Sequence, residues 1–229
     1  MSLAHRAFSL VARSSSKRHF RTKLRVRLAS EFRQAARFQK PRTTDRIVTR
    51  IFLTLASVST LLLLAVFVLG MSIDNPRELT SQKLVSWHLM LALTGLIFAA
   101  LVHAVVLTYF MGTGRWMEDV SKSYQLDDRW RGEGQRLKYR VIPWIGICIV
   151  LLLTTIGFGA AADPASRLSV THLLGVPVST LHFLVAITTV CCNVLGNVRE
   201  FQAIERNSQL ITEVVAKVRE MRITRGLPV

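Results

Sequence analysis

Acidic residues and reactive cysteines are scarce in this chain of 229 residues. It has 14 Asp/Glu against 30 Lys/Arg, a formal net charge of +16, although 50% of its residues are apolar. Its three cysteines, Cys148, Cys191 and Cys192, all lie in apolar runs, and no CxxC pair or Cys/His zinc spacing occurs. The sequence therefore predicts neither a structural zinc site nor a disulfide framework. It also lacks an HExxH motif and a nucleophile–base pair, so it offers no signature of an enzyme.

Long apolar runs, by contrast, dominate the sequence. Four of them reach the roughly 20 residues that a helix needs to cross the hydrocarbon core of a bilayer. A chain in lipid must satisfy its backbone N–H and C=O groups within the segment, so each run is expected to be a helix. We therefore predict an all-α, polytopic membrane protein with transmembrane helices at about 51–71, 84–111, 141–162 and 176–198.

Basic residues are distributed unevenly along the chain. Residues 1–50 hold 14 Lys/Arg, the segment 112–140 holds seven, and the tail from Arg199 holds six. The two other connections carry equal numbers of basic and acidic residues, so the positive-inside rule predicts that both termini lie in the cytoplasm. The expected organisation is a basic cytoplasmic arm over 1–46, a four-helix transmembrane domain over 47–199, and an amphipathic cytoplasmic extension of the last helix over 200–229.

The second half of the chain matches the first at a constant offset of 84 residues. Eight identities fall in 43 aligned positions without a gap, among them His88 with His172 and Arg115 with Arg199. These matches lie at the two ends of a predicted span. They predict two similar helical hairpins that run parallel and are related by a pseudo-twofold axis along the membrane normal.

Histidines are the only basic residues inside the predicted spans, where an ionisable group is costly and usually faces the bundle interior. His88 lies near the outer end of the second span. His172 lies near the outer end of the fourth, or just before it if Pro177 starts that helix, and His182 lies ten residues further on. Two facing imidazoles are the axial ligands of a b-type haem, and helix bundles hold such cofactors in their cores. His88 with His172 or with His182 is therefore a candidate haem site.

Histidines at the membrane interface without a cofactor would explain the same pattern. His88 follows Trp87, a common interfacial anchor, and interhelical hydrogen bonds in membranes average about 0.6 kcal/mol without any cofactor. A third interpretation is proton or metal handling by these histidines together with Asp74 or Asp163. His103, fifteen residues beyond His88, has no histidine at the equivalent position in the fourth span.

Both ends of the chain indicate contacts outside the bundle. The arm is rich in Arg and Ser, which is typical of a segment bound to anionic lipid and equally of a mitochondrial targeting sequence. Nucleic-acid binding would use the same charge, but no aromatic platform or reading helix accompanies it. The tail over 200–222 has apolar residues at a and d spacing, which predicts packing against residues 116–124 or contact with a second subunit. Arg115 and Arg199 are expected to face lipid head groups.

The stretch MGTGRW, from Met111, contains a glycine pair that is expected to end the second helix. The run LVHAVVLTYFMGTGRWMEDVSKSY, from Leu101, resembles a segment of small, uncharacterised bacterial four-helix integral membrane proteins with a YF-x-GTG-[RK]-W helix end. The resemblance implies a bacterial cytoplasmic membrane, with the mitochondrial inner membrane as the alternative, and it implies no activity. The long basic arm is the main departure from that pattern.

The sequence thus predicts first a non-catalytic membrane subunit or accessory protein that acts through helix–helix and lipid contacts. Its expected partners are bilayer lipid, anionic at the cytoplasmic face, and a homo- or hetero-oligomer formed through 200–222. The alternative is a small electron-transfer protein with one b-type haem near the outer face. A transporter is disfavoured because there are only four predicted spans and they have no charged residues in their interiors.

Overall fold

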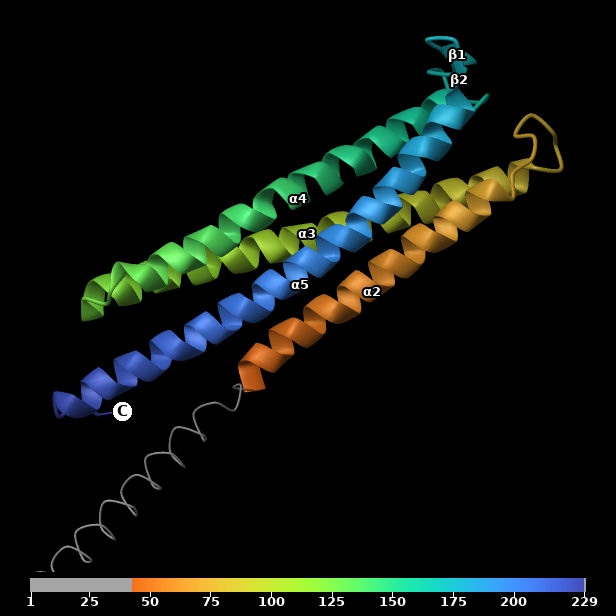
Figure 1. Cartoon of the computed structure of the whole chain (residues 1–229). Coiled ribbons are helices and arrows are strands. Elements are labelled where there is room, and N and C mark those ends of the chain that lie inside the picture. Colours follow the sequence, from red (N-terminus) through yellow and green to blue (C-terminus); the bar gives the residue numbers. More distant parts are fainter. Residues whose placement is uncertain (1–42, 229) are drawn as a thin grey trace, which may run out of the picture. The chain divides into compact units, whose positions relative to one another are not determined.

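Four long helices form most of the described chain (Figure 1). The computed structural model describes residues 43–228, with side chains from residue 47 onward. The predictions made for the basic arm fall on 1–42 and lie outside the described residues, and the first helix begins at Thr43, inside the predicted arm. The elements in chain order are α2 (Thr43–Met71), α3 (Gln82–Tyr124), α4 (Asp128–Ala162), β1 (His172–Leu173), β2 (Val176–Pro177) and α5 (Val178–Thr224).

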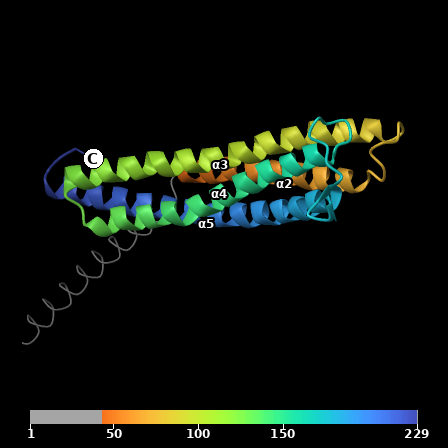
Figure 2. The same ribbon diagram turned by 90° about the horizontal axis from the view of Figure 1, so that it is seen from above.

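All four helices are long and apolar enough to cross a membrane, as the apolar runs predicted. They lie side by side along one direction (Figure 2). Large apolar side chains on their outer faces are open, including Leu61 at 67%, Ile97 at 64% and Val150 at 62% exposed. In water such surfaces would be unfavourable, whereas in a bilayer they face lipid. The chain is a multi-pass membrane protein by the length and composition of its helices.

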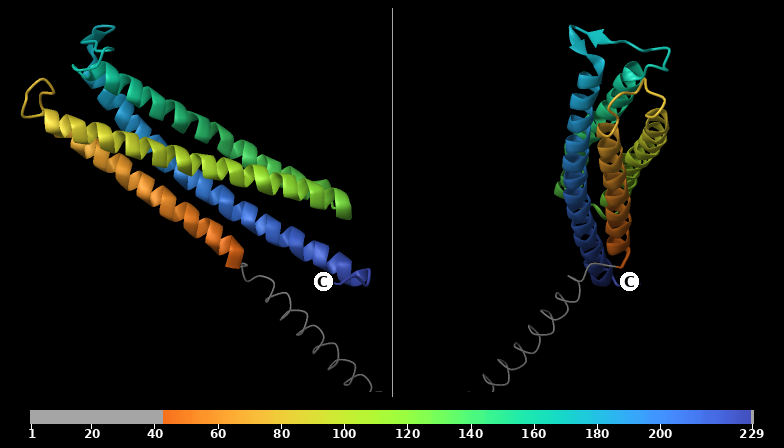
Figure 3. Two further views of the ribbon diagram at one scale, coloured as in Figure 1. Left: turned by 180° about the vertical axis from the view of Figure 1, so that it is seen from behind. Right: turned by 90° about the vertical axis from the view of Figure 1, so that its right-hand side faces the viewer.

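The two longer connections lie at the same end of the bundle (Figure 3). Residues 72–81 join α2 to α3, and residues 163–177 join α4 to α5. The second connection contains the antiparallel pair β1–β2, which the all-α prediction did not include. At the opposite end, α3 passes into α4 through Gln125, whose left-handed backbone caps α3, and Asp127, whose side chain accepts a hydrogen bond from Arg129 N and caps α4.

The helix α3 continues through Gly112 and Gly114, so the prediction that this glycine pair ends the helix is wrong. A glycine inside a helix costs about 1 kcal/mol relative to alanine. Here the flanking side chains Phe110 and Met117 are 3% and 1% exposed, and burial of each contributes more than that cost. Tertiary packing therefore carries the helix across both glycines.

The last helix extends well beyond the predicted span, as the spacing of apolar residues in the tail predicted. It packs against α4, where Leu210 lies beside Gly134, and against α3, where Asn207 donates hydrogen bonds of 3.1 Å to Tyr109 Oη and to Thr113 Oγ1. The main hydrophobic core lies in the half of the bundle that contains the α3–α4 connection. Its members are Phe52, Ala56, Val102, Val106, Phe110, Met117, Leu137, Val141, Ala203, Ile204 and Leu210.

Candidate functional site

His88 packs directly on a glycine of the neighbouring helix. A Cβ added to Gly70 of α2 would lie 2.9 Å from His88 Cε1, closer than real Cβ atoms approach other side chains. The glycine is therefore what allows the imidazole to lie flat against α2. One turn earlier, the carbonyl oxygen of Val66 lies 3.2 Å from His88 Nδ1. Because a carbonyl oxygen can only accept, Nδ1 carries the hydrogen and donates it.

His182 makes the same two contacts with α4. A Cβ added to Gly159 would lie 3.1 Å from His182 Cε1, and His182 Nδ1 lies 3.1 Å from the carbonyl oxygen of Thr155. Again the carbonyl lies four residues before the glycine. Each histidine therefore has its ring on a glycine and its Nδ1 hydrogen bonded to a backbone oxygen of the adjacent helix.

The two imidazoles face each other between α3 and α5. The ring centres of His88 and His182 lie 6.3 Å apart, and the ring planes are 89° to each other. With the hydrogen on Nδ1, a neutral ring presents an unprotonated Nε2 that can accept a proton or bind a metal. Within residues 47–228 neither Nε2 has a hydrogen-bond partner. The arrangement thus leaves two free bases close together inside the bundle.

The spacing of the two rings matches that of two axial ligands of one metal. An imidazole nitrogen binds a transition metal at about 2 Å, and the ring centre lies about 1 Å behind that nitrogen. Two imidazoles on opposite sides of one iron therefore have ring centres about 6 Å apart. Among the described residues no group of three or more His, Cys, Asp and Glu could hold a metal ion. Two histidine nitrogens could supply only two ligands of a metal, and a cofactor such as a porphyrin would have to supply the others.

The half of the bundle around this pair has few buried residues, one of them Val178 at the start of α5, which is 2% exposed. In the four segments that surround the histidines no residue is buried, while each helix has buried residues in its other half. These segments are 60–71, 82–94, 153–162 and 179–188. Their interior contacts are apolar, such as the rings of Phe67 and Phe183, whose centres lie 5.7 Å apart. Partly exposed, mostly apolar side chains therefore surround the histidine pair.

His172 lies elsewhere. It belongs to β1, is exposed, and pairs with Pro177 across the two-stranded sheet, because α5 begins only at Val178. Of the two pairings that the sequence left open, the structure brings together His88 and His182. The offset of 84 residues had placed His172, not His182, opposite His88.

Sequence reasoning missed a second polar cluster around His103. Its Nδ1 lies 2.7 Å from Glu200 Oε1 and its Nε2 lies 3.2 Å from Asn193 Oδ1, and both ring nitrogens are therefore engaged. His103 is 1%, Asn193 2% and Glu200 0% exposed. The thiol of Cys148 lies beside them, packed against Gly196. A signal existed in the sequence, since Asn193 and Glu200 are seven residues apart and so share one helix face.

The remaining predicted site residues lie apart from both clusters. Arg115 is exposed on α3, and the Arg199 guanidinium lies 5.9 Å from the ring centre of Trp144. Nearby, an apolar groove of about 320 Å³ lies between α2, α3 and α5. Its lining residues are Val48, Tyr109, Gly112, Thr113, Trp116, Ile204, Ser208 and Ile211.

Comparisons with protein-family models, with curated proteins and with solved structures find no match for this chain.

Proposed function

We propose that this chain is a membrane-embedded electron carrier that holds one b-type haem between His88 and His182. The observation that supports it is the facing pair itself: ring centres 6.3 Å apart, with both Nδ1 atoms engaged and both Nε2 atoms free. The sequence alone favoured a non-catalytic subunit, and the facing pair of imidazoles supports the haem carrier instead. Haem, when bound, supplies one-electron chemistry.

The chain's own residues would position and tune the ligands. Gly70 and Gly159 fix where each ring lies, and the carbonyl oxygens of Val66 and Thr155 fix its rotation and tautomer. A hydrogen bond from Nδ1 to an acceptor also raises the basicity of Nε2, which strengthens its bond to iron. A histidine that served only as an interfacial anchor would need neither a glycine beneath it nor a fixed tautomer.

The distribution of basic side chains predicts how the bundle is oriented in the membrane. Basic side chains gather at the end opposite the histidine pair, on α3, α4 and α5, and the positive-inside rule places that end in the cytoplasm. We infer that both termini are cytoplasmic and that haem lies toward the outer face. The resemblance of residues 101–124 to bacterial membrane proteins favours a bacterial cytoplasmic membrane, with anionic lipid around Arg115 and Arg199.

A second candidate function is that of an accessory subunit which binds a partner through the end of α5. The observation that favours it is the exposure of the last part of α5. No residue of α5 after Val214 is buried, and the apolar side chains of Val215 and Val218 are only half-buried. An apolar edge on a projecting helix can contact another chain. This role is compatible with electron transfer, since many carriers work within larger assemblies.

The test is a reduced-minus-oxidised absorption spectrum of the detergent-purified protein after expression with added haem precursor. We expect a b-type α-band that disappears in His88→Ala and in His182→Ala. His172→Ala is the matched control, because His172 is exposed in the β1–β2 hairpin, and the band should remain unchanged. A spectrum without haem bands in a folded protein would refute the proposal, as would loss of the band in His172→Ala alone.

A further inference from the structure

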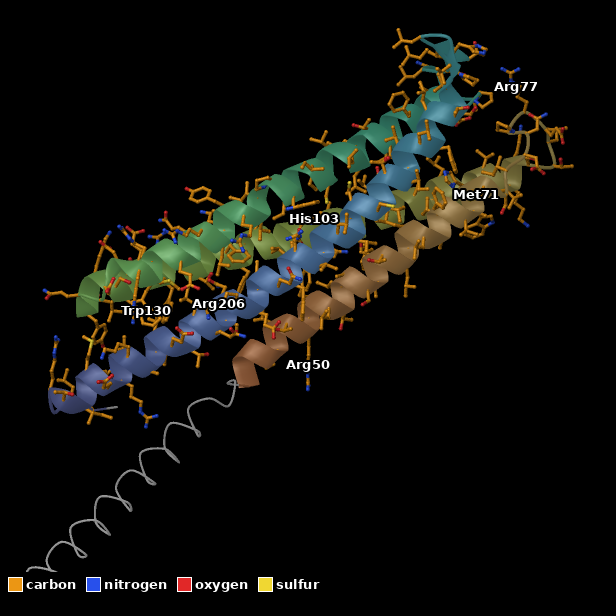
Figure 4. All side chains as sticks on the ribbon, in the orientation of Figure 1. Arg50, Met71, Arg77, His103, Trp130 and Arg206 are labelled. Carbon is orange, nitrogen blue, oxygen red and sulfur yellow. The ribbon has the colours of Figure 1, made fainter. Side chains whose placement is uncertain are left out.

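Polar contacts between α4 and α5 extend from the histidine pair toward the second polar cluster. His182 donates to the carbonyl oxygen of Thr155, whose side-chain Oγ1 lies 2.6 Å from Thr189 Oγ1. Asn193 Nδ2 donates to the carbonyl oxygen of Thr189 over 2.9 Å. Asn193 then contacts the second polar cluster. The hydrogen bonds are joined through the covalent frames of Thr155 and Thr189, so these residues of α4 and α5 lie between the two sites. Figure 4 shows His103 between the two ends of the bundle.

The hydrogen bonds fix the tautomer of His103. Because Asn193 Nδ2 already donates to a carbonyl oxygen, the atom that faces His103 Nε2 is Asn193 Oδ1, an acceptor. His103 Nε2 must therefore carry a hydrogen. The 2.7 Å contact between His103 Nδ1 and Glu200 Oε1 also needs a hydrogen, which either side can supply. The pair accordingly shares one proton and is neutral overall.

Glu200 has a second oxygen with no partner. Its Oε2 is buried and makes no hydrogen bond within residues 47–228. An unpaired buried acceptor is costly, and a proton placed on it would remove the negative charge from the carboxyl group. The other groups that face the pair are Cys148 of α4, whose thiol donates to the carbonyl oxygen of Cys192, and Thr60 of α2, which accepts from Asn197 of α5. None of the side chains of α2 at this level carries a charge.

We propose that the His103–Glu200 pair is a proton-binding site of the membrane interior, coupled to the redox state of the His88–His182 site. The inference rests on the proposed function. When a one-electron reductant adds one negative charge at the histidine pair, the proton affinity of Glu200 Oε2 rises, and a fraction of a proton per electron binds there from bulk water. The charge added to the protein is then partly compensated inside the membrane, where an uncompensated charge is unfavourable.

The distance between the two sites determines how strongly the added charge changes the proton affinity of the His103–Glu200 pair. His103 lies fifteen residues beyond His88 on α3, which is about 22 Å along the helix axis. At an effective dielectric constant of about 20, one added charge at this distance raises the proton affinity of the pair about three- to fourfold. By reciprocity, protonation shifts the one-electron midpoint potential by about 30 mV.

The experiment is a redox titration of the haem-loaded protein at several pH values. We expect the midpoint potential of the wild type to fall as pH rises, and to become independent of pH in Glu200→Gln. Glu205→Gln is the matched control, since Glu205 is exposed on the same helix, and it should behave as the wild type. A wild-type potential that does not change with pH, or a dependence that persists in Glu200→Gln, overturns the inference. The pH dependence of the wild-type midpoint potential is measured without any variant, so this part of the test does not depend on whether a variant folds.

Infrared spectroscopy separates this inference from the proposed function. A carboxylic-acid C=O signal that moves in D₂O should appear or shift on reduction, and it should be absent in Glu200→Gln. If the protein binds no haem, the proposed function has failed, and the coupling to redox state fails with it. An acid-minus-alkaline infrared spectrum of the haem-free protein then tests the proton site alone: a signal lost in Glu200→Gln supports it, and no such signal overturns it.

Discussion

The close approach of Gly159 to His182 gives the sharpest test of the histidine site. In Gly159→Ala the new Cβ would lie 3.1 Å from His182 Cε1, tighter than ordinary van der Waals contact. The ring must move by a few tenths of an ångström, and the 3.1 Å hydrogen bond to Thr155 O must lengthen or bend with it. Gly157→Ala is the matched control, because it lies two residues away on α4 and a Cβ there meets nothing within 4 Å.

Two opposing effects determine the free-energy change that Gly159→Ala causes. Replacing a helical glycine by alanine stabilises the helix by about 1 kcal/mol. Inserting a methyl group into a tight contact costs about 1–3 kcal/mol. Gly157→Ala has only the first effect, whereas Gly159→Ala has both. We therefore expect the control to be neutral or slightly stabilising, and Gly159→Ala to lower haem affinity roughly five- to 150-fold if the whole contact cost falls on the ligand.

The assay is haem titration of the haem-free protein in detergent, followed by the α-band, with thermal unfolding measured in parallel. Equal haem affinity in the two variants would refute the claim that Gly159 positions the His182 ring. A loss of haem affinity in Gly157→Ala equal to that in Gly159→Ala would show that α4 responds to any added methyl group. In either case the glycine could not be counted as part of the site.

Three further predictions concern stability, measured by denaturant unfolding in mixed micelles. Glu200→Ala should lower the free energy of unfolding by about 3 kcal/mol, because it removes the buried partner of the His103 imidazole. The control Glu205→Ala, at an exposed position, should change it by no more than about 0.5 kcal/mol. Leu174→Asn should stabilise by about 1 kcal/mol, because Leu174 is 95% exposed and held at φ +54°, a left-handed conformation that asparagine adopts more readily; Leu168→Asn should not. Arg206→Ala should cost no more than about 1 kcal/mol, since its ion pairs are 39% exposed or more, and a larger loss would contradict this account.

The fold could be predicted because lipid imposes one strict rule on the chain. Apolar runs of the required length must be helices. Three of the four predicted spans lie within helices of the structure, and the fourth does so except for Val176 and Pro177, which form β2. The helix ends were less predictable. α3 runs on to Tyr124 through Gly112 because Met117 is buried against Gly134, a contact between residues on two different helices that local propensity does not reveal.

The histidine site was predicted only in part, and the reason lies in the connections. Gly70 and Gly159 are 89 residues apart, whereas His88 and His182 are 94 residues apart, although their contacts are the same. The difference of five residues equals the difference between the ten-residue connection after α2 and the fifteen-residue connection after α4. An alignment without a gap cannot align Gly70 with Gly159 and also His88 with His182. The gapless offset of 84 residues therefore paired His88 with His172.

The two halves of the bundle have different sources of stability, and this difference bears on the proposed function. In one half, buried apolar side chains such as Met117 and Leu210 hold the helices together. In the other half no residue of the surrounding segments is buried, yet two imidazoles are held there in fixed tautomers on glycines. Rotamer and desolvation costs are incurred at His88 and His182 where few buried apolar side chains, such as Val178, are present to offset them. A bound porphyrin would offset both costs, since it buries apolar area where the side chains do not and uses the lone pairs that the hydrogen bonds leave free.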